Sequence, residues 1–148
     1  MKKIAIIGAG ISGLFFANLL KNNSNYDFTI FEKNTSLNME NGYGIQLSPN
    51  SVKLLNEIGF KNLDINNFFN PKKISFINAK DNKKICDLDI SKFNDYNNHY
   101  TTLKRSTLLK FLFDPSRSFD LVFKPIQLLG FSTIVTPLFT FSRCGRLT

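Results

Sequence analysis

KIAIIGAGISG, at residues 3–13, joins a short apolar run to the pattern GxGxxG. The run at residues 3–7 predicts a β-strand buried on both faces of a parallel sheet. Gly8 permits a tight turn out of that strand, and Gly10 lets a pyrophosphate approach the backbone. Gly13 allows the helix that follows to pack closely against the strand. The stretch therefore predicts a strand–turn–helix unit that binds the diphosphate of a nucleotide.

A helix and a second strand complete this unit. Apolar residues recur three apart along the helix, at Leu14, Ala17 and Leu20. The strand at residues 28–32 ends in Glu32, 19 positions after the last glycine of the motif. Its carboxylate can accept hydrogen bonds from ribose hydroxyls and would repel a 2′-phosphate. This order of elements indicates a nucleotide-binding βαβ unit; the alternative is a glycine-rich turn in an unrelated α/β domain. The unit alone does not separate NAD from FAD.

A second informative segment is GYGIQLSPNSVKLLNEIGF, at residues 42–60. Ser48 is a candidate N-cap for a helix whose first residue is Pro49. Gly59 is suited to the left-handed stop of that helix. The glycines before the helix let the backbone lie close to something flat or bulky. The expected apolar face of the helix consists of Val52, Leu54, Leu55 and Ile58.

Here the sequence resembles a known family. The pattern Gly-x-Gly-Ile-x-Leu-x-Pro-Asn at residues 42–50 is similar to the class A FAD-dependent aromatic monooxygenases, such as salicylate hydroxylase, 4-hydroxybenzoate hydroxylase and the ubiquinone-biosynthesis hydroxylases. A third match lies at residues 103–109, where Arg105 resembles an arginine that precedes a helix and contacts the flavin cofactor in that family. The resemblance covers about residues 2–113 and is to the N-terminal portion of the family only.

The resemblance implies FAD as the cofactor and gives residues their roles. The three glycines of the turn would hold the pyrophosphate, and Glu32 would hold the adenosine ribose. A loop at residues 42–47 would lie near the ribityl chain and flavin ring. Arg105 would bind a phosphate or ribityl oxygen, unless it is an ordinary surface arginine near a helix start. The expected cofactor-binding residues are Gly8, Ala9, Gly10, Ile11, Ser12, Gly13, Glu32, Lys33, Gly44, Ile45, Gln46 and Arg105.

The resemblance also implies a reaction. In that family NAD(P)H reduces FAD, O₂ adds to the reduced flavin, and the flavin hydroperoxide hydroxylates a small aromatic substrate. The cofactor carries this chemistry, so we assign no catalytic side chain. The family's later Asp-Gly and Gly-Asp-Ala-type elements are absent from the sequence. Two alternatives stay open: a catalytically inactive nucleotide-binding fragment of such an enzyme, and an NAD-dependent dehydrogenase domain.

The middle of the chain predicts two strands, at residues 73–77 and 84–88, joined by a short loop. The resemblance places comparable strands at the start of a substrate-side sheet. We therefore expect an α/β fold: a Rossmann-like FAD-binding βαβ unit with a parallel sheet, followed by an incomplete antiparallel substrate-side portion. Asp87 and Asp89 are expected to be solvated rather than an acid/base pair. His99 is expected to be a surface or packed residue without a catalytic role.

Composition narrows the functional class. The 148 residues carry a formal charge of +8, but the lysines are scattered and no nucleic-acid motif accompanies them, so we expect no nucleic-acid partner. Cys86 and Cys144 form neither a metal cluster nor a disulfide framework, and each is expected to be a part-buried, inert thiol. Without a secretory signal, these features favour the cytoplasm. The oligomeric state is left open.

The composition changes near residue 113. Asparagine is frequent up to Asn98 and absent afterwards, whereas three of the four arginines follow residue 113. We therefore separate residues 1–113, the FAD-binding portion, from an atypical tail at residues 114–148. The tail is either a linker or distinct element, or the product of a frameshift or truncated reading frame, which we favour. Its apolar stretch at residues 119–141 contains a lysine and two prolines, so we expect no membrane span.

Overall fold

A computed structural model of the chain describes residues 1–21, 23–37, 39, 42–114 and 120–123. Its strands and α-helices, in chain order, are β1 (Lys2–Ile7), α1 (Ile11–Lys21), β2 (Tyr26–Glu32), β3 (Gly44–Leu47), α2 (Pro49–Glu57), β4 (Phe68–Phe69), β5 (Lys73–Ile77), β6 (Lys84–Asp89), β7 (Thr101–Lys104), α3 (Arg105–Leu112) and β8 (Leu121–Phe123). Short 3₁₀ turns occur at Phe60–Asn62, Ile65–Asn67 and Ser91–Phe93. The expected α/β class, with parallel and antiparallel portions, is confirmed.

The first sheet has the strand order β1-β2-β8, and both of its pairings are parallel. Ile7 is paired with Phe31, and the Gly8 N–H donates to the Phe31 carbonyl at 2.8 Å. This register brings the end of β1 beside Glu32, the last residue of β2. The prediction that β1 is buried on both faces is wrong. Ile6 is buried in the core, whereas Ile7 is 70% exposed, because α1 packs against one side of the sheet.

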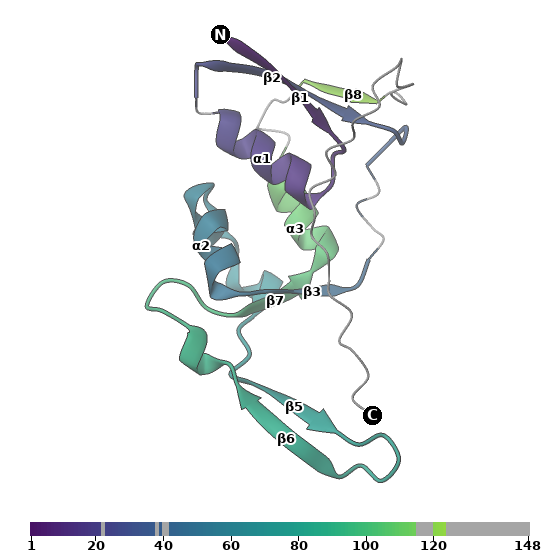
Figure 1. Cartoon of the computed structure of the whole chain (residues 1–148), viewed down its shortest axis with the longest axis vertical. Helices are drawn as coiled ribbons and strands as arrows, with labels where there is room; N and C mark the ends of the chain where they lie inside the picture. Colours follow the sequence, from purple (N-terminus) through teal and green to yellow (C-terminus); the bar gives the residue numbers. More distant parts are fainter. Residues whose placement is uncertain (22, 38, 40–41, 115–119, 124–148) are drawn as a thin grey trace, which may run out of the picture.

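The main core lies between this sheet and two helices. In Figure 1, α1 runs beneath β1 and β2, and α3 lies on the far side of α1. The most deeply buried apolar side chains of this core include Leu14, Ala17, Ile30, Leu108 and Leu112. Each large aliphatic side chain buried in this way contributes about 1.5–3 kcal/mol. The predicted apolar residues of α1 are thus confirmed as core residues.

Asn18 is a buried polar residue within that core. Its side-chain Nδ2 donates to the Leu14 carbonyl at 2.8 Å and to the Leu112 carbonyl at 2.9 Å. Because the last carbonyls of a helix have no partner within the helix, the second bond satisfies the C-terminal end of α3. Asn18 therefore ties α1 to the C-terminal end of α3. Arg105 is the first residue of this same helix.

The second sheet is antiparallel, with the order β3-β7-β4, and α2 packs beside it. The helix starts at Pro49 as predicted, and Gly59 has the expected left-handed backbone, with φ +93°. Ser48 occupies the predicted N-cap position, but its hydroxyl makes no cap bond to a backbone N–H and donates to the Asn50 side chain. One detail of the prediction is wrong: Leu54, expected on the apolar face, is 49% exposed.

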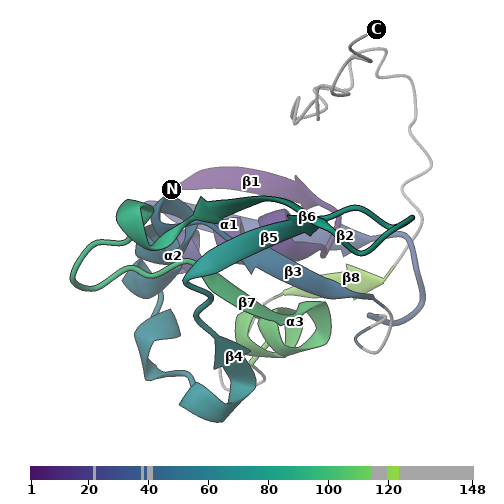
Figure 2. The same ribbon diagram turned by 90° about the horizontal axis from the view of Figure 1, so that it is seen from below.

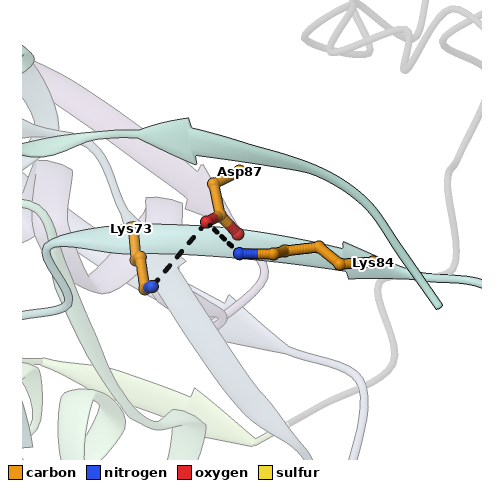
Figure 3. A network of polar contacts seen from close by, with 3 residues as sticks. All are labelled: Lys73, Lys84 and Asp87. Carbon is orange, nitrogen blue, oxygen red and sulfur yellow. Dashed lines mark hydrogen bonds and ion pairs between the residues drawn. The ribbon is translucent and has the colours of Figure 1, made fainter. Parts of the chain in front are cut away.

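Strands β5 and β6 form a hairpin that extends away from the first sheet (Figure 1). In Figure 2, which views the molecule from the hairpin end, this hairpin lies in front of the fainter β1 and β2. The Asp87 carboxylate lies 2.9 Å from the Lys84 ammonium and 3.7 Å from that of Lys73 (Figure 3). A side-chain hydrogen bond with Ser75, followed by one with Lys84, lowers the pKa of Asp87. These groups are exposed, so the ion pairs add little stability. Cys86, expected to be partly buried, is exposed on this hairpin.

None of the helices within the described ranges is long and apolar enough to cross a bilayer. Most of the tail at residues 114–148, including Cys144 and nearly all of residues 119–141, lies outside those ranges. Strand β8 belongs to the tail and pairs with β2, at Ile30 with Leu121 through Glu32 with Phe123. The domain boundary at residue 113 stays a prediction.

Candidate nucleotide-binding site

The glycine turn between β1 and α1 is the first component of the site. Gly8 takes a left-handed backbone, with φ +95°, which turns the chain sharply out of β1. Helix α1 begins at Ile11, and its first 5→1 bond runs from the Leu14 N–H to the Gly10 carbonyl at 2.9 Å. The amides before Leu14 in this turn have no such helical acceptor, and the helix dipole adds partial positive charge there. The turn therefore presents donors suited to an anion.

Gly10 and Gly13 have different steric surroundings. A Cβ added at Gly10 would meet no atom within 4 Å, so open space lies beside this residue. A Cβ added at Gly13 would lie 2.0 Å from the Gly8 carbonyl oxygen and 3.3 Å from the Cγ2 of Ile6. Gly13 thus allows α1 to pack on the end of β1, as predicted. Gly10 leaves a gap through which a ligand can reach the backbone.

Glu32 lies at the mouth of the turn and is only 8% exposed. Its Oε2 accepts a hydrogen bond from the Ala9 N–H at 2.9 Å. Its Oε1 accepts bonds from the Asn34 N–H at 3.0 Å and from the Asn34 Nδ2 at 2.9 Å. The backbone bond from Asn34 is the main cause that lowers the pKa of Glu32, against the opposing effect of burial. A fixed negative charge therefore stands beside the glycine turn at neutral pH.

Arg105 enters the site from the start of α3, directly after β7. Its N–H donates to the Tyr43 carbonyl at 3.1 Å, which continues the pairing of Gly44 with Lys104. The prediction of a loop over residues 42–47 is partly wrong, since Gly44–Leu47 forms β3. The reason is that β7, which lies more than fifty residues later in the chain, supplies a pairing partner.

A cavity of about 100 Å³ joins these elements. It is lined by Ala9, Gly10, Leu14, Glu32, Asn34, Ser36, Leu37, Met39, Arg105 and Leu109. Four of the expected cofactor-binding residues meet there: Ala9, Gly10, Glu32 and Arg105. The other expected residues do not line it: Gly8, Ile11, Ser12, Gly13, Lys33, Gly44, Ile45 and Gln46. Ligand-binding roles for all twelve stay predictions.

Sequence reasoning missed most of the remaining lining residues. Leu109 could have been found, because it lies four positions after Arg105 and shares its face of α3. Asn34 follows Glu32 by two, a spacing at which a side chain can accept a backbone N–H, as Glu32 does here. Ser36, Leu37 and Met39 carry no such signal, since they reach the cavity through the path of an irregular segment.

The other candidates lie elsewhere. His99 is exposed outside this cavity, and its backbone carbonyl accepts a bond from the Thr101 hydroxyl at 2.8 Å. Asp87 and Asp89 belong to the exposed hairpin. Over the part of the chain that the structure describes, no three His, Cys, Asp or Glu residues form a group that could hold a metal.

Comparisons with known proteins agree with this geometry. The family of NAD(P)-binding Rossmann-like domains matches residues 6–41. The 3-amino-4-hydroxybenzoate 2-monooxygenase of Streptomyces cremeus is 42% identical over 59 residues, which are 40% of this chain and 14% of that protein. An FAD-dependent monooxygenase of Colletotrichum higginsianum is 28% identical over 128 residues, or 84% of this chain and 27% of that protein.

Solved structures show the same fold. The tetrameric form of 2-methyl-3-hydroxypyridine-5-carboxylic acid oxygenase superimposes with a TM-score of 0.68 at 21% identity. The match covers 83% of this chain and 31% of that one. The chain also spans only part of the two curated relatives described above, 14% and 27% of their lengths.

Proposed function

The chain resembles the N-terminal portion of the FAD-dependent aromatic monooxygenases, and on this premise we propose that its glycine turn, Glu32 and Arg105 bind FAD. One observation carries the proposal: residues from three separate parts of the chain line a single cavity. Gly10 comes from the first turn, Glu32 from the end of β2 and Arg105 from the start of α3. Backbone amides, a carboxylate and a guanidinium are the groups that a diphosphate with a ribose requires.

The residues present fit this group. The open space beside Gly10 admits a phosphate to the turn, and a side chain there would fill that space. The ionised carboxylate of Glu32 can accept a bond from a ribose hydroxyl through the Oε2 lone pair that the Ala9 N–H does not use. Its charge disfavours a 2′-phosphate at the same position. A cavity of about 100 Å³ is smaller than the roughly 300–1,000 Å³ of a complete small-molecule site, so it suits a ribose–phosphate portion of the cofactor.

When bound, FAD would supply the redox and oxygen chemistry of a monooxygenase that uses NAD(P)H and O₂ to hydroxylate a small aromatic molecule. The residues of this chain would bind and orient the cofactor. Glu32 would fix the adenosine ribose, the turn amides would hold the pyrophosphate, and Arg105 would neutralise a phosphate or bond a ribityl oxygen. No residue of this chain need act as a nucleophile, because the cofactor carries the chemistry.

Flavin uptake tests the proposal. FAD is titrated into the purified chain while the visible spectrum and flavin fluorescence are recorded, and saturable binding is expected. Arg105→Ala removes a charge-assisted hydrogen bond of about 1.5–3 kcal/mol, so it should weaken binding by roughly 10- to 100-fold. Lys104→Ala is the matched control, because it removes the neighbouring exposed lysine and should change affinity less than about twofold. Absence of flavin uptake by the unaltered chain refutes the proposal.

A second candidate is nucleotide binding without turnover. The lining of the cavity favours it, because the groups gathered there can bind a nucleotide and none is assigned a catalytic role. Oxidation of NAD(P)H by the flavin-loaded chain, measured with a panel of phenolic acids, separates the two candidates: turnover excludes the second.

A third candidate is an NAD-dependent dehydrogenase domain, favoured by the match of residues 6–41 to NAD(P)-binding Rossmann-like domains. A ligand that binds the folded state raises its melting temperature according to its affinity. Greater stabilisation by NAD than by FAD at equal concentration would support this candidate.

A further inference from the structure

Gly42 lies against the side chain of Arg105. A Cβ added at Gly42 would stand 2.7 Å from the Cδ of Arg105, 3.2 Å from its Cβ and 3.4 Å from its Cγ. Gly42 also has a backbone φ of +134°, which L side chains rarely adopt. The backbone of Gly42 therefore lies close to the aliphatic stem of Arg105, and any other residue type there would require that stem to shift.

The same segment fixes the backbone of Arg105. The Tyr43 carbonyl accepts the Arg105 N–H at 3.1 Å, and the next residue, Gly44, is paired with Lys104 in the antiparallel sheet. Arg105 is thus held at its amide by one residue of the segment and along its stem by the preceding one. An arginine side chain can adopt several staggered rotamers. A backbone packed on one side of its stem excludes the rotamers that point toward that backbone.

We propose that Gly42 is a positioning residue for Arg105. Its lack of a side chain lets the backbone pack on the Cβ–Cδ stem and holds Arg105 in the conformation that lines the cavity with Gly10 and Glu32. The part of the nucleotide that Arg105 would then contact is a phosphate or the ribityl chain. This inference rests on the proposed function only for its ligand, because the contact between Gly42 and Arg105 exists without one.

A double-mutant cycle tests the proposal, using the unaltered chain, Gly42→Ala, Arg105→Ala and the double variant. The added Cβ meets the 2.7 Å contact only when the arginine stem is present. Gly42→Ala should therefore lower the melting temperature more in the unaltered chain than in the Arg105→Ala background. The strain of the positive φ is present in both backgrounds and cancels in this comparison. An equal loss in both backgrounds would overturn the proposed contact.

FAD affinity gives the second readout of the cycle. Gly42→Ala should weaken FAD binding about fivefold or more in the unaltered chain, and less than about twofold once Arg105 is alanine. The same weakening in both backgrounds means that Gly42 acts on the cofactor directly or through the loop, and it would overturn the positioning role. Gly42→Ala combined with Lys104→Ala is the matched control, and it should behave as Gly42→Ala alone. If the unaltered chain takes up no FAD, the proposed function fails, whereas the thermal cycle still decides the contact.

Discussion

Gly13→Ala is expected to destabilise the chain by forcing α1 away from β1. The new Cβ would stand 2.0 Å from the Gly8 carbonyl oxygen and 3.2 Å from the Gly8 carbonyl carbon. An ordinary contact needs about 3.4 Å, so the two backbone segments must separate by about 1.4 Å. No rotamer change can relieve the 2.0 Å overlap, because the carbonyl oxygen of Gly8 belongs to the backbone.

The magnitude follows from two opposing effects. Overpacking of a well-packed region typically costs about 1–3 kcal/mol, and contact with backbone places this case near the upper value. Alanine is favoured over glycine within a helix by at most about 1 kcal/mol. We therefore expect a net loss of about 2 kcal/mol or more. For a domain of this size, such a loss lowers the melting temperature by roughly 8 °C or more.

Thermal unfolding followed by circular dichroism measures this loss. Gly10→Ala is the matched control, since it adds the same methyl group three residues earlier, where no atom lies within 4 Å. The control should melt with the unaltered chain but bind FAD more weakly, because its methyl group occupies the space proposed for the pyrophosphate. A Gly13→Ala protein that melts within about 1 °C of the unaltered chain would refute the steric argument.

Three further changes test other parts of the fold. Glu32→Gln should flatten the loss of stability in acid: the folded pKa of Glu32 lies below the ordinary value of 4.5, so its stabilising contribution is present above about pH 4.5 and disappears as pH falls through the lowered value. Melting curves between neutral and acid pH measure this, and parallel profiles for the two proteins would contradict it. Asn18→Ala should cost about 1–3 kcal/mol in urea unfolding, because it leaves the buried Leu112 carbonyl without its donor; an unchanged midpoint would count against that bond. Gly59→Ala should cost about 1 kcal/mol by the same measurement, since φ +93° is unfavourable for alanine, and a more stable variant would exclude a left-handed backbone there.

Much of the fold was predictable from local patterns. The apolar run before the glycines, the helix after them and the strand ending in Glu32 were placed within about three residues of β1, α1 and β2. The two middle strands were also found, because alternation and turn residues signal a hairpin without reference to the rest of the chain. Ser48 was correctly placed at the N-cap of α2, although its side chain makes no cap bond.

Burial of the predicted elements was less predictable than their existence. An apolar strand sequence indicates a buried strand but not what covers each face, and Ile7 is 70% exposed where burial was expected. Leu54 shows the same effect on α2. Coverage depends on where distant elements pack, and that information is not contained in the periodicity of one segment.

The amino-acid sequence by itself determines the glycine turn and the acidic residue near it, because the steric freedom of glycine and the length of one βαβ unit are local properties. Tertiary packing decides which other residues join these groups at the cavity. It supplies the Ala9 N–H that donates to the Glu32 carboxylate, and it brings Arg105 to the same cavity from more than seventy residues away. Contacts between distant segments depend on sheet pairing and helix docking, which no single stretch of the chain encodes.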